Sequence, residues 1–191
     1  GAVALAPLLA RIATDEGAIA GAKGLSLRCV LHGPAGLAVH SDAQLLERVL
    51  RNLVSNAVRY THAGGVLLQA DLRGGGLRLR VADSGIGIPQ ARRADVFQEF
   101  VQLHNPERDR DQGLGLGLAI VQRLCALLSA PLQLRSRPGR ARCSRCGCRW
   151  PAHRRRCRQP MAPACQPGPA PACRLGPAPA CPRWRRATWC W

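Results

Sequence analysis

Apolar side chains recur at regular spacings as far as about residue 135, and these spacings predict a series of helices and strands. Residues 3–20 and the segment from Asp42 to about Tyr60 have the three- and four-residue spacing of helices, and Ser41 and Asp42 can cap the second of them. A short helix is predicted around 91–100 and a longer one over 116–128. Strands are predicted at the alternating or short apolar segments 25–31, 37–40, 66–72, 77–83 and 132–135.

The order of these elements indicates the fold class. The chain runs helix, two strands, helix, two strands, short helix, long helix, strand. Repeated parallel β-α-β units are not evident, and residues 73–76 have the composition of a hairpin turn. We therefore predict an α+β fold, a two-layer α/β sandwich with a largely antiparallel sheet.

The composition changes sharply near residue 137. Residues 137–191 hold 13 of the 28 Lys and Arg residues and eight of the ten Cys, but no acidic residue and no Val, Ile, Phe or Tyr. The net charge of +17 therefore leaves only +4 for residues 1–136. A segment of this composition cannot build an ordinary core, which excludes a chain of two globular domains. We predict a folded domain over 1–140 and a disordered, low-complexity tail over 141–191.

The beginning of the chain and its apolar runs bear on its context. No apolar run reaches the length of a membrane span, and the first residues lack the pattern of a signal peptide. The one Met is Met161, so we expect the sequence to be a fragment of a longer protein.

The first polar cluster is Asn52 and Asn56, one helical turn apart at the edge of an apolar stripe, with Arg59 and Tyr60 close by. Amide oxygens can ligate a hard cation such as Mg²⁺, and amide NH₂ groups can reach phosphate oxygens. Taken alone, the pair fits better an ordinary structural role in which both amides bond to backbone groups at a helix edge.

The second cluster, Asp83-Ser-Gly-Ile-Gly87, directly follows a predicted strand. The two-residue period places Asp83 on the same face as Leu77, Leu79 and Val81, so its carboxylate needs a donor among apolar neighbours. The exocyclic amine of adenine is one candidate, and Gly85 and Gly87 would let the backbone approach a flat base. A capping Asp in a tight turn is the alternative.

The third cluster, Gly113-Leu-Gly-Leu-Gly117, opens an apolar helix, and free amides at such a position attract anions. It fits neither a dinucleotide fingerprint nor a Walker loop, because Leu118 stands where the fingerprint has Gly and no Gly-Lys-Ser/Thr occurs. Glycines that simply punctuate a helix remain an alternative for this motif.

Taken together, in order and spacing, four motifs carry a specific resemblance. The segments that begin at Asn52, Asp83, Phe97 and Gly113 resemble the N, G1, F and G2 boxes of the ATP-binding catalytic domain of sensor histidine kinases. This family belongs to the gyrase, Hsp90, histidine kinase and MutL superfamily, and the resemblance covers roughly residues 3–140. It implies a Bergerat-type α/β sandwich, bound ATP with Mg²⁺, and phosphoryl transfer to a histidine in a bacterial two-component pathway.

The resemblance also implies roles for individual residues. Asn56 would ligate Mg²⁺, with Asn52 and Arg59 near the phosphates and Tyr60 near the nucleotide. Asp83 would accept from the adenine amine. The remaining ATP-binding residues would shape the base pocket or present lid amides to the phosphates: Gly85, Gly87, Gly113, Gly115, Leu116, Gly117 and Leu118. Phe97 and Phe100 resemble lid packing residues, whereas Arg108 and Arg110 fit a γ-phosphate contact less well than a solvated loop.

The residue type at the position of Asn52 differs between classes of this superfamily. Hydrolysing members have a water-activating Glu one turn before the Mg²⁺-binding Asn, and a neutral amide is a poor general base. The resemblance therefore favours phosphotransfer over hydrolysis and argues against a topoisomerase, chaperone or mismatch-repair ATPase. The implied partners are the dimerisation and phosphoacceptor domain of the same kinase and a response regulator, in a cytoplasmic, homodimeric parent protein.

The sequence departs from the family in two places. None of its five His residues has the setting of a phosphoacceptor, so no catalytic residue is assigned and the acceptor domain lies outside the chain. After Arg140 the usual Gly-Ser/Thr-x-Phe strand is replaced by Ala141-Arg-Cys-Ser-Arg145, which predicts that the closing strand of the sheet is missing. A reading frame shifted after about Arg140 would explain this, and Cys residues repeat every eight positions from Cys157 to Cys181.

Other readings stay open at this point. The Cys143-x-x-Cys146-x-Cys148 spacing, with His153 and Cys157 nearby, fits a zinc site poorly, and no nucleic acid is expected on the Arg- and Trp-bearing tail. An inactive ATP-binding remnant, or a relative of the serine kinases that act on anti-sigma partners, is the alternative to an active histidine kinase domain.

Overall fold

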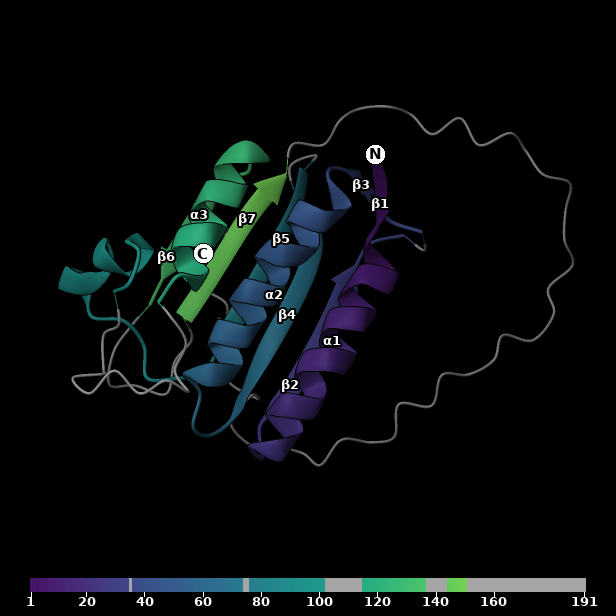
Figure 1. The fold of residues 1–191 in the computed structure, drawn as a ribbon. Coiled ribbons are helices and arrows are strands. Elements are labelled where there is room, and N and C mark those ends of the chain that lie inside the picture. The colour runs from purple at the N-terminus through teal and green to yellow at the C-terminus, as the bar shows by residue number, and fades with distance from the viewer. Residues whose placement is uncertain (35, 74–75, 102–114, 137–143, 151–191) are drawn as a thin grey trace, which may run out of the picture. The chain divides into compact units, whose positions relative to one another are not determined.

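The computed structural model describes residues 1–34, 36–73, 76–101, 115–136 and 144–150 (Figure 1). All of these residues lie in one compact unit, Gly1–Arg155. The predicted boundary at 140 therefore falls inside this unit, ahead of its last described strand. Among the described residues, no helix is long and apolar enough to cross a membrane.

Three helices lie side by side over one face of the sheet: α1 (Leu5–Ala22), α2 (Ala43–Arg59) and α3 (Gly117–Leu127) (Figure 1). Each agrees with a predicted helix to within about two residues. Asp42 caps α2 as predicted, since its side chain accepts a hydrogen bond from the amide of Leu45 at 2.9 Å. The short helix expected around 91–100 is instead two 3₁₀ turns, Gln90–Arg92 and Asp95–Phe97.

The main sheet has five strands in the order β2-β4-β5-β7-β6. Their bounds are Ser26–His32 for β2, Gly65–Arg73 for β4, Gly76–Asp83 for β5, Ser144–Trp150 for β7 and Leu132–Arg135 for β6. The β2–β4 pair is parallel and the other three pairs are antiparallel, which confirms the largely antiparallel sheet. Two further strands, β1 (Ala2–Ala4) and β3 (Ala38–His40), form a separate antiparallel ribbon.

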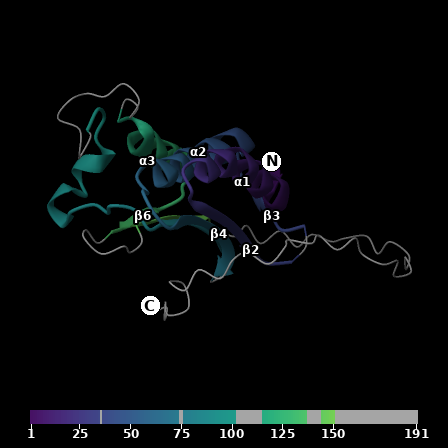
Figure 2. The same cartoon turned by 90° about the horizontal axis from the view of Figure 1, so that it is seen from below.

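Helices and sheet form the two predicted layers, as the view from below shows (Figure 2). The core lies between them, where the apolar faces of α1 and α2 meet those of β4 and β5. Val66, Leu68 and Ala70 of β4 alternate with more exposed residues, which is the period of a strand with one buried face. The largest fully buried side chains include Leu5, Leu9, Ile12, Leu46, Leu50 and Leu68.

The expectation that the sheet lacks its closing strand is wrong. β7 lies between β5 and β6 and pairs antiparallel with both, with Asp83 opposite Ser144 and Leu77 opposite Trp150. Its sequence, Ser-Arg-Cys-Gly-Cys-Arg-Trp, lacks the family's motif and all β-branched residues, which is why the pattern did not indicate a strand. It does alternate Arg or Gly with Cys, Ser and Trp, and this two-residue period is compatible with a strand.

Candidate nucleotide-binding site

The carboxyl-terminal half of α2 supplies the first group of predicted site residues. Its apolar stripe, which includes Val49, Leu50 and Leu53, faces the core, and this orientation leaves Asn52 and Asn56 half-buried at the edge of the stripe. The Nδ2 group of Asn52 donates to the backbone oxygen of Arg48 at 2.8 Å. The side chain of Asn52 therefore has the structural role named above as the alternative, in which the amide NH₂ group bonds to the helix backbone.

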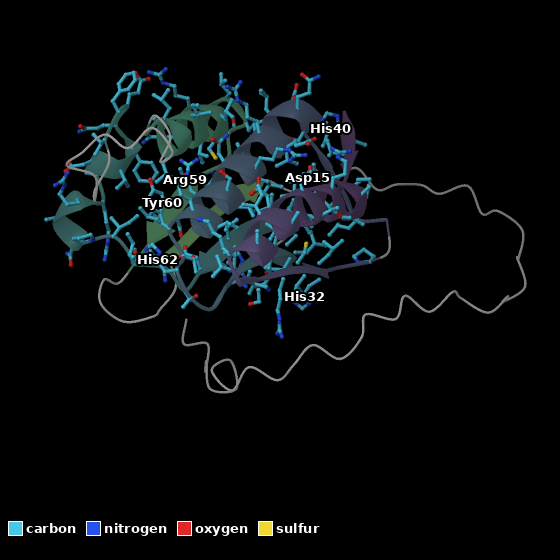
Figure 3. All side chains as sticks on the ribbon, turned by 60° about the horizontal axis from the view of Figure 1, so that its bottom comes forward. Asp15, His32, His40, Arg59, Tyr60 and His62 are labelled. Carbon is cyan, nitrogen blue, oxygen red and sulfur yellow. The ribbon has the colours of Figure 1, made fainter. Side chains whose placement is uncertain are left out.

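Arg59 and Tyr60 lie where α2 ends, with His62 just beyond them (Figure 3). Tyr60 is exposed, and its backbone amide donates to the oxygen of Asn56. The Lys23 ammonium donates to the backbone oxygens of Val58 and Arg59, each at 3.4 Å, and so places a positive charge at the negative end of the helix dipole. The end of α2 is thereby fixed against the end of α1.

The segment after β5 closes directly onto the end of α2. The amide of Ile86 donates to the backbone oxygen of Tyr60 at 3.3 Å. A Cβ atom built on Gly85 would lie 2.4 Å from that same oxygen, which is too close for any side chain. Gly87 has a φ of +75°, in the region that favours glycine. Both glycines of this motif thus meet a geometric requirement of the backbone.

Asp83 is half-buried at the end of β5, where the sheet turns into this segment. Leu77, Leu79 and Val81, the residues that share its face by alternation, are all buried. The Oδ1 atom of Asp83 accepts from the amide of Gly85 at 2.9 Å, which sets the orientation of the carboxylate. The capping Asp in a tight turn, named above as the alternative, is therefore present. The same hydrogen bond orients the carboxylate that is predicted to bind the base.

Ser84 is a structural residue of this region to which the sequence analysis gave no role. Its Oγ accepts from the amide of Gly65 at 2.9 Å and donates to the backbone oxygen of Ala63 at 2.8 Å. These bonds attach the Asp83–Gly87 segment to the turn that leads from α2 into β4. The only sequence signal for this role was a serine directly after Asp83, together with the turn predicted at residues 61–65.

The amino-terminal end of α3 approaches α2 at Asn56. A Cβ atom on Gly117 would lie 2.8 Å from Nδ2 and 3.2 Å from Oδ1 of Asn56, so the absence of a side chain there makes room for the amide. Gly115 has a φ of +68°. Leu116 precedes the first residue of α3, and both it and Leu118 are half-buried. Gly113, Arg108 and Arg110 lie outside the described residues.

Within the described part of the chain, the predicted residues thus meet at two contacts. Asn56 meets Gly117 at one of them, and Tyr60 meets Gly85 beside Asp83 at the other. Both join the same part of α2 to another element, and Asn56 and Tyr60 are one helical turn apart. Phe97 ends the second 3₁₀ turn, whereas Phe100 is 69% exposed and is not packed in a core.

A buried carboxylate on α1 interacts electrostatically with charged residues of α2. Glu16 of α1 is 8% exposed, and burial raises its pKa, while Arg51 lowers it, Asp15 raises it and Arg59 lowers it. The described residues contain no group of three or more His, Cys, Asp or Glu that could hold a metal ion. Cys146 and Cys148 lie on β7, and the other predicted zinc ligands lie outside the described ranges.

Residues 41–151, more than half of the chain, match the family described as histidine kinase-, DNA gyrase B- and HSP90-like ATPase. Several relatives are sensor histidine kinases. RcsC of Escherichia coli K12 is 34% identical over 117 residues, which are 61% of this chain and 12% of RcsC. AruS of Pseudomonas aeruginosa is 44% identical over 101 residues, which are 50% of this chain and 10% of AruS. The chain therefore spans about an eighth or less of these relatives.

Solved structures agree with this assignment. Full-length ShkA in complex with AMPPNP matches at a TM-score of 0.67 and 32% identity, over 79% of this chain and 30% of ShkA. The catalytic domain of the histidine kinase ThkA shares the fold, with a TM-score of 0.65 at 19% identity, over 80% of this chain and 96% of that domain. The chain therefore belongs to the histidine kinase-, DNA gyrase B- and HSP90-like ATPase family, as an ATP-binding catalytic domain of the sensor histidine kinase type.

Proposed function

We propose that this domain binds Mg²⁺-ATP along the carboxyl-terminal half of α2 and passes the γ-phosphoryl group to a histidine on a dimerisation domain outside this chain. The observation that carries the proposal is the pair of contacts that α2 makes. One joins Asn56 to the start of α3, and the other joins Tyr60 to the glycine segment beside Asp83. Each contact suits one end of a nucleotide.

The contact at Asp83 suits the base. An oriented, half-buried carboxylate can accept a hydrogen bond from the 6-amino group of adenine, which a guanine base lacks. Gly85 and Gly87 keep the neighbouring backbone free of side chains, so a planar ring can lie against it. Tyr60, exposed at the end of α2, offers an aromatic side chain at the rim of the same region.

The contact at Asn56 suits the phosphates. The amides at the start of α3 offer hydrogen-bond donors at the positive end of an 11-residue helix. Gly115, Leu116, Gly117 and Leu118 form this helix start, and Gly113 precedes it in the sequence. Arg59 lies in the last turn of α2, and we propose that it adds a positive charge near the phosphates.

The residues at this contact fit a magnesium ion bound together with the nucleotide. Asn56 supplies an amide oxygen, a ligand that Mg²⁺ accepts, and Gly117 leaves the space that this amide needs. Mg²⁺ would neutralise charge on the phosphates. One amide and the phosphate oxygens suit an ion that retains several waters, so a closed protein cage is unnecessary.

Asn52 supports transfer rather than hydrolysis. Its Nδ2 group is committed to the backbone oxygen of Arg48, and its amide has no group that takes a proton from water at neutral pH. A bound ATP would therefore meet no general base at this position. The phosphoryl group would instead go to a histidine presented by the separate domain, with positioning and charge neutralisation supplying the catalysis.

The proposed setting follows the relatives. The parent protein would be a homodimeric sensor kinase whose dimerisation domain presents the acceptor histidine and whose response regulator receives the phosphoryl group. This domain would act in the cytoplasm. We further propose that the Arg- and Pro-rich residues after β7 take no part in nucleotide binding.

Nucleotide titration tests the proposal. Wild-type protein should bind ATP saturably with Mg²⁺, and Asp83→Ala should weaken ATP by tenfold or more with or without the metal. Asn56→Ala should weaken it chiefly when Mg²⁺ is present. Asp15→Ala removes an exposed carboxylate on α1 and should bind like wild type. No saturable binding by wild type, or equal binding by all variants, would contradict the assignment.

Phosphotransfer needs a second measurement. The domain is mixed with a separately produced dimerisation domain of a related sensor kinase and γ-labelled ATP, and acid-labile label on that domain is followed. Transfer that depends on Asp83 and Asn56 supports the kinase reaction. ATP binding without transfer to any of several such domains would identify the chain as an inactive ATP-binding remnant.

A further inference from the structure

Ser136 is a buried residue that joins the far edge of the sheet to the segment proposed to receive adenine. It directly follows β6 and is 3% exposed. Its Oγ accepts from the backbone amide of Ile88 at 2.7 Å, across 48 positions of sequence. Its backbone oxygen also accepts from the guanidinium of Arg93, which lies five residues beyond Ile88.

The bond to Ile88 completes a set of attachments along one short segment. The amide of Ser84 donates to the oxygen of Gly65, that of Gly85 to the Asp83 carboxylate, and that of Ile86 to the oxygen of Tyr60. The first part of the segment is therefore held by β4, by its own turn and by α2. Ile88 marks the end of the segment, and there the partner is a side chain from beyond β6.

We propose that Ser136 is a positioning residue for adenine recognition, which acts through Ile88 on the Gly85–Gly87 segment. This inference rests on the proposed function of that segment. Gly87 has a φ of +75°, and a glycine restricts its own backbone dihedrals very little. The path from Asp83 to Ile88 is therefore fixed only if both of its ends are held. Ser84 holds one end, and Ser136 holds the other.

Loss of the hydroxyl has a definite physical consequence. Ser136→Ala leaves the part-buried amide of Ile88 without this acceptor, so the segment gains by moving to reach water or another oxygen. Such a movement displaces the backbone that faces the base. Asp83 stays at the end of its strand, so its distance to a bound 6-amino group changes. The contacts proposed for the phosphates lie at α3 and are unaffected.

The test measures base recognition separately from stability. Full-chain wild type, Ser136→Ala and Ser136→Thr are titrated with ATP and with purine riboside triphosphate, which is ATP without the 6-amino group, both with Mg²⁺. Ser26→Ala is the control, because the exposed Ser26 hydroxyl donates to the oxygen of Gly64 and leaves the amides of the segment alone. Thermal unfolding of each variant is recorded alongside.

Wild type should prefer ATP by about tenfold, the value of one well-made hydrogen bond. Ser136→Ala should lose most of that preference while its affinity for purine riboside triphosphate changes less than twofold, and Ser136→Thr should restore it. A variant that unfolds earlier yet keeps the full ATP preference would overturn the inference and assign Ser136 a purely structural role. Wild type without saturable ATP binding would instead contradict the proposed function itself.

Discussion

Strands β4 and β7 both pair with β5 along its length, but the two strands differ sharply in composition. On the β4 side, Val66, Leu68 and Ala70 are almost fully buried against the helices. β7 carries no Val, Ile, Leu or Phe, and its seven residues include two Arg and a Gly. The register of β4 is thus fixed by a packed core, whereas the composition of β7 leads us to expect that its register depends chiefly on backbone pairing.

This difference matters for the site, because the proposed nucleotide-binding residues lie mostly on the side held by the core. Asn52, Asn56 and Tyr60 come from α2, and Asp83 ends β5. The β7 side contributes Ser136, which follows β6, and this residue acts on the segment after β5 through its direct hydrogen bond with the amide of Ile88.

The largest expected effect comes from breaking β7. Gly147 lies in the middle of this strand, opposite Arg80 of β5 and Gln133 of β6. Gly147→Pro removes a ladder donor from a strand paired on both sides and should lower the free energy of unfolding by about 2–3 kcal/mol. Urea unfolding followed by circular dichroism measures this.

The control for this change is Gly168→Pro in the proposed tail, which should leave the unfolding midpoint where it is. If Gly147→Pro also leaves the midpoint unchanged, β7 contributes nothing to stability. Of the two strands that pair with β5, only β4 would then stabilise the fold.

The second prediction breaks the opposite side, at Gly85. A methyl group there meets the backbone oxygen of Tyr60 at 2.4 Å, and neither the end of α2 nor the end of β5 can move freely. Gly85→Ala should destabilise the domain by about 1–3 kcal/mol and reduce ATP affinity more than tenfold. Thermal unfolding and nucleotide titration report the two effects.

Gly21→Ala is the matched control for Gly85. A Cβ on Gly21 meets nothing within 4 Å, and the residue lies inside α1, so alanine there should raise stability by about 0.5–1 kcal/mol. Equal behaviour of the two variants would show that the segment after β5 does not approach α2 closely.

The sequence predicted the core side well because its pattern expresses burial directly. The period of α2 and the alternation of β4 and β5 placed Asn56 and Asp83 correctly at the edges of apolar faces. It failed at β7, where Cys, Gly and Arg give no apolar alternation and the pairing with β5 joins positions more than 60 residues apart in sequence. The short β1, assigned to the helix after it, was missed because its partner β3 lies beyond α1 and β2 in the sequence.

Within the site, the residue types were predictable but the attachments between them were not. A motif such as Asp83-Ser-Gly-Ile-Gly87 indicates its own turn. Nothing in it indicates that Ser136, far along the chain, accepts from Ile88. The fit of Asn56 against Gly117 likewise depends on how α2 and α3 pack, which the spacing of apolar residues sets only approximately.

A third prediction sharpens the comparison within the core side. Gly117→Ala places a methyl group 2.8 Å from Nδ2 of Asn56, and this side chain can turn away, unlike the backbone oxygen at Gly85. Stability should therefore change little, while the affinity for ATP with Mg²⁺ falls about tenfold because the proposed ligand is displaced. Affinity without the metal should fall less. A loss of stability with unchanged Mg²⁺ dependence would count against Asn56 as a ligand.

The smallest expected effect is on the pH dependence of stability. It arises from acidic residues of α1 and α2, since β6 and β7 contain no acidic residue. Burial raises the pKa of Glu16 above its usual value of 4.5, so the folded domain holds this proton more tightly than the unfolded chain. The stability that this adds is complete below that value and is lost as pH rises through the higher pKa of the folded state.

Glu47, on α2, works in the opposite direction. Its hydrogen bond with Arg51 lowers its pKa below the usual 4.5, so its contribution is present above that value and fades as pH falls through the lower pKa of the folded state. The difference in unfolding temperature between variant and wild type should therefore become more positive from pH 4 to pH 7 for Glu16→Gln. For Glu47→Gln the same difference should become more negative. Thermal unfolding of both variants across pH 3 to 8 measures the two slopes, and slopes of the same sign would contradict the burial of Glu16.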